Sequence, residues 1–300
     1  MMRHSLPATI VVYAMMGLLG VMPMTVSAAG FAILEQSVKG LGGAFAGGAA
    51  IAEDASTVFF NPAGLTRLRG VQTEAALHII IPSFRFKNQG SALNGALTGG
   101  VPMPGTLSGG NGGDAGEVGA VPNVYYAHQL TDRLHVGLGV NVPFGLSNEY
   151  RDGWVGRYHA LRSELSAINV NPSLAFKATS FLSIGAGLNI QYVKARLTSA
   201  IDQSALCLGL AARGRVPSTL CASAGLVTPG NVATDAEIDL DDATDISLGY
   251  NVGVLFTPTS SMRFGVHFRS AIRHELEGDA KFDRVNTTLS NTTGLLVDQG

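Results

Sequence analysis

Apolar residues alternate strictly with small or polar residues along much of the chain after residue 70. The pattern is clearest at residues 134–144, 182–196 and 246–256, where Leu, Val, Ile and aromatic residues alternate with Gly, Ser and Asn. A period of two sustained over this length predicts β-strands, because successive side chains of a strand point to opposite faces. Seven strands are expected, at residues 71–86, 120–130, 134–144, 161–177, 181–201, 245–257 and 262–282.

The connections between these strands fall into two classes of length. Three are tight turns, at residues 131–133, 178–180 and 258–261, and three are long, at residues 87–119, 145–160 and 202–244. A water-soluble sandwich could also alternate in hydrophobicity, but it has no reason to separate short from long connections so regularly. Short turns at one end and long loops at the other are typical of outer-membrane barrels. The predicted fold is therefore all-β, a transmembrane antiparallel β-barrel.

The first 28 residues have the layout of a secretory signal peptide. Arg3 and His4 give a basic start, residues 6–21 are mostly apolar, and residues 26–28 are small or short enough for a signal peptidase. The alternative is a membrane anchor, but the apolar run is short for a span of about 20 residues and is interrupted by proline. We therefore expect cleavage before Ala29 and a mature chain that is exported.

Residues 29–70 are rich in Gly and Ala and carry few large apolar side chains. Gly makes up 38 of the 300 residues, well above the average usage of about 7%. The mean hydropathy of +0.25 nevertheless excludes a disordered low-complexity chain. A segment this poor in large side chains cannot form a core of its own. We expect it to pack as a plug inside the barrel of residues 71–300.

Composition also limits the partners and cofactors. A formal net charge of −2 gives no reason to expect nucleic-acid binding. Cys207 and Cys221 are the only cysteines and lie in one predicted long loop. In an oxidising compartment such a pair favours a disulfide; the alternative is a metal pair, but no His or Cys cluster surrounds it. We expect a disulfide, no metal and no cofactor.

The chain resembles the FadL family of outer-membrane transporters of long-chain fatty acids and aromatic hydrocarbons in its predicted plug, barrel and loop lengths and in several short sequence segments. The matching segments, in order, are Ala29-Gly30-Phe31, Gly40-Leu41-Gly42, residues 51–55, Asn61-Pro62-Ala63, Val121-Pro122-Asn123, Phe144-Gly145-Leu146 and Phe268-Arg269-Ser270. The resemblance implies a fourteen-stranded barrel blocked by an N-terminal hatch of short helices. Seven strands are about half of such a barrel and an odd number, so we expect the barrel to be incomplete here.

The resemblance also implies a lateral gate in the strand at residues 134–144. In the family this strand is kinked inward beside the hatch. The predicted gate residues are Pro143, Phe144 and Gly145, because proline removes a ladder donor and glycine removes side-chain bulk. The alternative is an ordinary strand end before a loop.

The resemblance gives a role to the hatch motif and the N-terminus, whereas the roles of the cations are inferred from the residues, since the family places its basic residue where this chain has Ser199. Asn61, Pro62 and Ala63 are expected to hold the hatch; the alternative is a simple turn that ends a helix, and both can be true. The mature N-terminus, at Ala29, Gly30 and Phe31, is expected to lie near the ligand. Lys194 and Arg196 are candidates for binding a ligand carboxylate, although they could instead be interfacial anchors. Arg269 and Arg273 could pair with Glu275 or with the hatch acids Glu53 and Asp54.

These observations favour outer-membrane transport of long-chain fatty acids or other hydrophobic compounds, with a lateral exit to the bilayer. An acyl chain prefers an apolar wall by about 0.8 kcal/mol per CH₂. The main alternative is a passive porin. An enzyme barrel is a weaker alternative, because the histidines of this chain are scattered over several strands and no serine motif accompanies them. The histidines concerned are His78, His128, His135 and His267. Expected partners are a hydrophobic ligand, outer-membrane lipid and lipopolysaccharide, with a monomeric full-length protein.

Overall fold

The computed structural model describes residues 32–93 and 107–297. The predicted signal peptide, together with Ala29, Gly30 and Phe31, lies outside the described residues. Within the described ranges, no helix has the length and apolar character needed to cross a membrane.

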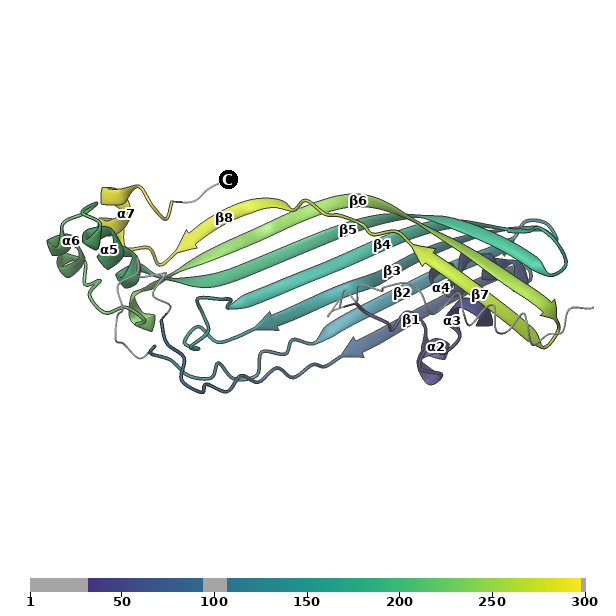
Figure 1. The fold of residues 1–300 in the computed structure, drawn as a ribbon, viewed down its shortest axis with the longest axis horizontal. Helices are drawn as coiled ribbons and strands as arrows, with labels where there is room; N and C mark the ends of the chain where they lie inside the picture. Colours follow the sequence, from purple (N-terminus) through teal and green to yellow (C-terminus); the bar gives the residue numbers. More distant parts are fainter. Residues whose placement is uncertain (1–31, 94–106, 298–300) are drawn as a thin grey trace, which may run out of the picture. The chain divides into compact units, whose positions relative to one another are not determined.

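Eight antiparallel strands form one sheet in which β1 to β7 are neighbours in sequence order and β8 also pairs with β6 (Figure 1). Their bounds are β1 Val71–Ile80, β2 Gly119–Gln129, β3 Leu134–Glu149, β4 Arg162–Lys177, β5 Leu182–Asp202, β6 Asp235–Thr259, β7 Met262–Arg269 and β8 Glu277–Asp283. Tight turns join β2 to β3, β4 to β5 and β6 to β7, which places consecutive strands side by side.

Four boundaries differ from the sequence prediction. β3 extends to Glu149 rather than ending at residue 144, so it takes in the first five residues of the predicted loop. β1 ends at Ile80 rather than at residue 86, and β6 begins ten residues earlier than residue 245. The acidic composition of residues 235–244 is typical of a loop, but these residues pair with the equally long β5. The last predicted strand is divided into β7 and β8. In β7, Arg269 pairs with Asn251 of β6. In β8, Asp279 pairs with Asp241 of β6. Both partners are thus displaced by ten residues, so β7 and β8 keep the same register along β6.

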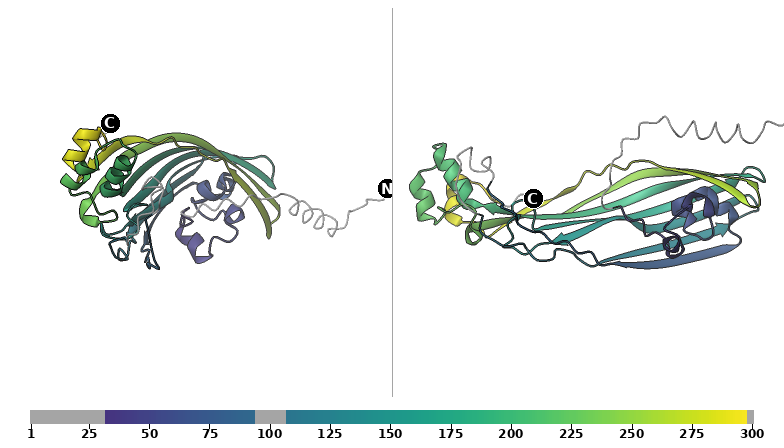
Figure 2. Two further views of the ribbon diagram at one scale, coloured as in Figure 1. Left: turned by 60° about the vertical axis from the view of Figure 1, so that its left-hand side comes forward. Right: turned by 60° about the horizontal axis from the view of Figure 1, so that its bottom comes forward.

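The N-terminal segment forms four short helices against the concave face of the sheet (Figure 2, left). They are α2 Val38–Gly42, α3 Gly48–Ile51, α4 Thr57–Phe60 and the 3₁₀ helix η1 Pro62–Arg67. Val58 and Leu65 are fully buried and pack with Tyr125 of β2 in a small apolar core. We call residues 32–70 the hatch and the sheet face that holds them the lumen face.

Glycines on the lumen face give the hatch its room. A Cβ atom at Gly185 would overlap the backbone of Pro62 and Ala63, and one at Gly253 would overlap the side chain of Asn61. A Cβ atom at Gly137 would likewise overlap the side chain of Val58. The small residues that alternate with apolar ones in the sequence are therefore needed for close approach of the hatch to the wall.

Replacing Gly253 with alanine should displace the hatch from β6. The added methyl group would overlap Asn61, and such overpacking typically costs about 1–3 kcal/mol. Amide hydrogen exchange of residues 57–67 should accelerate in refolded protein. Gly42→Ala is the matched control, because a Cβ at Gly42 meets no atom within 4 Å. Equal protection in both variants would contradict this packing.

Helices α5 Gln203–Ala212, α6 Ser218–Ser223 and α7 Thr287–Thr293 gather at the end of the sheet opposite the tight turns (Figure 1). A disulfide joins Cys207 of α5 to Cys221 of α6. Both cysteines are fully buried and pack against Leu289 of α7. The disulfide and this core give the long connection before β6 a compact structure of its own.

Candidate functional site

The wall of the sheet opens between β2 and β3. These strands pair only from Gln129–His135 to Val124–Val140. Beyond that point, residues 119–123 of β2 pair with β1, while residues 141–149 of β3 pair with β4. Because the described structure gives these two stretches no pairing with each other, a gap separates them. We call the gap between residues 119–123 and residues 141–147 the β2–β3 window.

An irregularity in β3 accounts for the divergence of the two strands. Asn141 pairs with Asn169, but the next paired residue is Phe144, opposite Ala167, so Val142 and Pro143 form a bulge. Pro143 has no N–H to offer to a neighbouring strand. Bulges bend the strand that contains them.

The bulge also reverses which side chains face the lumen. Asn169 and Ala167 lie on the same lumen face of β4, and directly paired residues share a face. Asn141 and Phe144 therefore both point to the lumen side, and Gly145 takes the opposite side. Strict alternation along residues 134–144 would place Phe144 with Val140 on the lipid-facing side, and this expectation is wrong because the bulge interrupts the regular strand.

A cavity of about 390 Å³ fills the window region. Its lining is mainly apolar or small and includes Ile33, Ala120, Val121, Val142, Gly145 and Leu146. This volume lies in the range of small-molecule sites, about 300–1,000 Å³. The cavity therefore has the size and lining of a site for a hydrophobic compound.

The first described residues of the hatch lie along the window. The Ile33 N–H donates to the Pro143 carbonyl at 3.0 Å, and Ala32 forms a bridge with Phe144. On the other edge, the Asn123 side-chain amide donates to the Glu35 carbonyl at 2.8 Å. The segment is thus bonded to both edges of the window.

Gln36 fixes this segment to the bulge. Its Nε2 donates to the Val142 carbonyl at 2.9 Å, and its Oε1 accepts a hydrogen bond from Asn141 at 2.8 Å. Gln36 is fully buried. A chain of buried asparagine amides continues from Asn141 through Asn169 to Asn189. The sequence analysis missed Gln36; the only signal was asparagine recurring at lumen positions of adjacent strands.

A loop before β2 borders the far end of the window. Gly116 bridges to Asn148, and Asp114 accepts hydrogen bonds from Ser83 at 2.6 Å and from the backbone of Phe84 and Gly116. These bonds, with that from Arg85, hold the pKa of Asp114 well below its usual range. The loop is therefore tied both to β3 and to the residues that follow β1.

The Asp114 anchor should persist through mild acid. A carboxylate whose pKa is lower in the folded state stabilises the fold above its unfolded pKa, about 3.9. That contribution is lost only as the pH falls through the lower folded value. Hydrogen exchange of residues 83–86 should therefore be unchanged between pH 7 and pH 5 after correction for intrinsic rates. Loosening within that range would contradict the assignment, whereas Asp114→Asn should loosen the loop at both pH values.

Asn61 fixes the motif Asn61-Pro62-Ala63 to the rest of the hatch and to β6. Asn61 is fully buried; its Nδ2 donates to the carbonyls of Ala49 at 2.7 Å and Val254 at 3.0 Å. Its Oδ1 accepts the Ala63 N–H at 3.0 Å and caps η1, in which Pro62 is the first residue. One side chain thus joins two turns of the hatch to β6.

The predicted cations occupy different environments. Lys194 and Arg196 alternate in phase with Ile190 and Tyr192, whose exposed side chains face lipid. This face favours the interfacial alternative, and carboxylate binding by the two residues stays a prediction. The Arg269 guanidinium donates to the Phe59 carbonyl at 3.1 Å and lies over the Phe59 ring, rather than pairing with the hatch acids.

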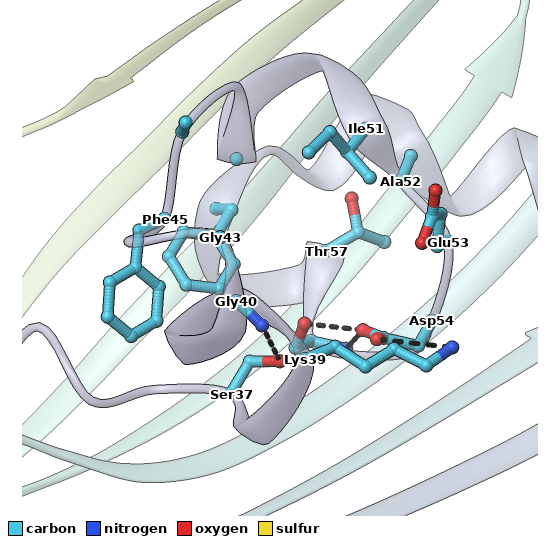
Figure 3. Close-up of a pocket in the computed structure, with 14 residues that line it drawn as sticks. Ser37, Lys39, Gly40, Gly43, Phe45, Ile51, Ala52, Glu53, Asp54 and Thr57 are labelled. Atoms are coloured by element: carbon cyan, nitrogen blue, oxygen red, sulfur yellow. Dashed lines mark hydrogen bonds and ion pairs between the residues drawn. The ribbon is translucent and has the colours of Figure 1, made fainter.

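A second, smaller pocket lies within the hatch (Figure 3). Gly40, Phe45 and Ile51 help to line it, and the Lys39 ammonium lies 4.0 Å from Asp54. Its volume of about 90 Å³ is below the usual range for ligand sites. In the described part of the chain, His, Cys, Asp and Glu side chains nowhere gather in the groups of three that a metal site needs. Of these two pockets, the window cavity is therefore the candidate site for a hydrophobic compound.

The sheet is antiparallel, with tight turns at one end and a gap between two strands, and it holds a hatch of short helices on its concave face. These features are typical of the wall of a plugged outer-membrane barrel. The sequence profile of the family described as "Outer membrane protein transport protein (OMPP1/FadL/TodX)" matches residues 20–298. The chain belongs to this family of outer-membrane proteins. The fold class and location predicted from the sequence are thereby confirmed.

Two curated relatives illustrate the relationship. Outer membrane protein P1 of Haemophilus influenzae is 30% identical over 82% of this chain and 54% of its own length. A long-chain fatty acid transport protein of Escherichia coli is 29% identical over 89% of this chain and 55% of its own. The chain spans about half the length of the curated relatives it matches.

Solved structures share the fold. A FadL homologue of Pseudomonas aeruginosa superposes with a TM-score of 0.65 at 24% identity, covering 89% of this chain and 60% of that one. The toluene transporter TbuX of Ralstonia pickettii gives a TM-score of 0.54 at 20% identity, covering 78% of this chain and 57% of that one.

Proposed function

We propose that the protein carries hydrophobic compounds across the outer membrane and releases them sideways through the β2–β3 window. The observation that carries the proposal is the window cavity, which has an apolar lining and lies between strands whose outer faces contact lipid. The substrates named for the relatives, long-chain fatty acids and toluene, are both hydrophobic and would suit such a path.

The energetics favour a lateral exit over an aqueous one. Each CH₂ group placed in water rather than in an apolar setting costs about 0.8 kcal/mol. A compound that leaves through the window passes from an apolar cavity directly to the outward side chains Leu138 and Val140, which are exposed to lipid. It need not enter the aqueous compartment below the hatch.

The hatch segment at residues 32–36 would act as the gate. Its bonds to Pro143, Val142 and Asn123 close part of the window. Breaking a few such bonds, each worth about 1 kcal/mol net, would widen the opening without unfolding the hatch core. Ala29, Gly30 and Phe31 directly precede this segment, which supports their proposed place near the ligand.

The porin alternative is less consistent with the lumen. A porin needs an open aqueous channel, whereas Val58, Leu65 and Asn61 of the hatch are fully buried against the wall. An enzyme would need a nucleophile and a base brought together, and we propose none. Monomeric function and contact with lipopolysaccharide belong to the same proposal.

Transport and passive diffusion can be separated by experiment. Cells that express the protein should take up labelled oleate with saturable kinetics, and purified protein in planar bilayers should show no stable ion conductance. Toluene uptake in the same cells would distinguish an aromatic from an acyl substrate. Stable conductance without saturable uptake of either compound would favour the porin.

A further inference from the structure

A cavity of about 470 Å³ lies at the tight-turn end of the sheet, apart from the β2–β3 window. Its walls are the end of the hatch, at residues 66–69, and the adjoining ends of β2, β4, β5 and β6 with the turns that follow β2 and β4. None of its described lining residues also lines the window cavity. We call it the turn-end cavity. In outer-membrane barrels the short turns lie on the periplasmic side, so this cavity lies at the periplasmic end of the wall.

The turn-end cavity lies on the lumen side of the wall. The Thr66 hydroxyl donates a hydrogen bond to the Ser183 hydroxyl at 2.7 Å, so Ser183 faces the hatch. Lys177 pairs directly with Ser183 and therefore shares its face. On β2, Gln129 follows Tyr125 of the hatch core by four residues and takes the same side. A ligand of this cavity therefore comes from water rather than from the bilayer.

The charges that line the turn-end cavity are mainly positive. Arg67, Arg69 and Lys177 line it, and Asp132 is the only acid among its described lining residues. Within residues 32–93 and 107–297, none of the three cationic side chains forms an ion pair or donates a hydrogen bond. They differ in this from Arg157, which is fully buried in an ion pair. Their N–H donors are therefore open to a bound anion.

The charge of Arg67 is not balanced by its surroundings. Partial burial and the positive charge of Arg263 lower the pKa of Arg67, although Glu53 acts in the opposite direction. Burial and a nearby like charge both disfavour the charged form of a side chain. An anion bound beside Arg67 would offset this penalty.

The backbone that carries the two arginines is fixed on both sides. Before them, Thr66 is bonded to β5. After them, the Gly70 N–H donates to the Gln129 side-chain oxygen at 3.1 Å, and the Gln129 N–H donates to the Gly70 carbonyl at 2.9 Å. Between them, Leu68 is buried in the apolar core of the hatch. An arriving anion therefore needs to order only side chains, which lowers the entropic cost of binding.

We propose that the turn-end cavity binds a compact, water-soluble phosphate-bearing anion from the periplasm. Guanidinium groups present paired N–H donors that match phosphate oxygens, and an ammonium adds a point charge. Three cations around one cavity suit a multivalent anion better than a single carboxylate. The volume lies in the range of small-molecule sites, about 300–1,000 Å³. The proposal does not depend on release through the window, because the two cavities have no described lining residue in common.

The test titrates the full chain in detergent with pyrophosphate, with binding measured by calorimetry at low ionic strength. Arg67→Gln with Arg69→Gln should weaken binding at least about tenfold, because charge-assisted hydrogen bonds are stronger than neutral ones. The matched control is Arg213→Gln with Arg215→Gln. These two arginines are also exposed and two residues apart, but they follow α5 at the long-loop end. The control should bind pyrophosphate as the parent does.

An expected gain of affinity guards against misfolded variants. Asp132→Asn removes the only acid of the described lining and should tighten pyrophosphate binding about two- to fivefold. Pyrophosphate should also slow amide hydrogen exchange of residues 66–70 in the parent, because the bound anion would join the end of the hatch to Lys177 of β4.

Three outcomes would overturn the proposal. The first is a parent that shows no saturable binding of pyrophosphate. The second is unchanged affinity in the Arg67 and Arg69 double variant, or weaker binding by Asp132→Asn. The third is citrate binding as tight as that of pyrophosphate, since it would assign the cavity to carboxylates.

Discussion

Replacing Gly145 with valine is expected to lower the uptake of labelled oleate about tenfold while the sheet still folds. A Cβ at this position would lie 3.1 Å from the Ile33 side chain, and the rest of the valine would occupy the window cavity. Overpacking by a few methyl groups typically costs about 1–3 kcal/mol, enough to change a rate tenfold or more. Valine is itself a good strand former, so β3 should persist.

Gly153→Val is the control for this substitution. A Cβ at Gly153 meets no atom within 4 Å, and the residue lies in the loop between β3 and β4. Uptake should be normal in that variant. Normal uptake by Gly145→Val, at equal amounts of folded protein, would remove the window from the transport path.

Asn61→Ala is expected to release the hatch from β6. The substitution removes the hydrogen bonds from Asn61 to the part-buried carbonyls of Ala49 and Val254 and removes the cap of η1. Each hydrogen bond is worth about 1 kcal/mol net and the cap about as much, so the hatch should lose roughly 2–4 kcal/mol of its docking free energy. Hydrogen exchange of residues 57–67 should rise towards the rate of unstructured peptide, and uptake should fall.

Asn88→Ala is the matched substitution outside the hatch. Asn88 also accepts backbone hydrogen bonds, but in an exposed loop. Its loss should leave both hydrogen exchange of the hatch and uptake unchanged. A protected hatch in Asn61→Ala would mean that packing on the wall glycines, rather than the asparagine, holds it.

Alternation alone predicted most of the sheet because it depends on local sequence and on a face that must contact lipid. It failed where pairing departs from regularity. Pro143 indicated a local irregularity in the sequence. The face that the Phe144 side chain occupies, however, is set by its pairing with Ala167 of β4, which the local sequence does not show. The start of β6 was hidden because acidic residues 235–244 gain their strand structure from β5.

Long-range hydrogen bonds were beyond the reach of local patterns. Gln36 is bonded to Asn141, a residue 105 positions away, and the recurrence of asparagine at lumen positions does not identify Gln36 as its partner. The outward position of Arg196, in contrast, was readable, since it alternates in phase with Ile190 and Tyr192. The motif Asn61-Pro62-Ala63 was noticed through resemblance, but its bond to Val254 required the structure.

The most direct test of the lateral exit is to block the window chemically in folded protein. Ser147 lines the window cavity, and the native cysteines are joined in a disulfide, so Ser147→Cys supplies the reactive thiol. Labelling with a bulky maleimide in intact cells should abolish most oleate uptake, whereas the same label on Asn291→Cys, an exposed residue of α7 at the long-loop end, should have no effect. Undiminished uptake after complete labelling at residue 147 would contradict release through the β2–β3 window.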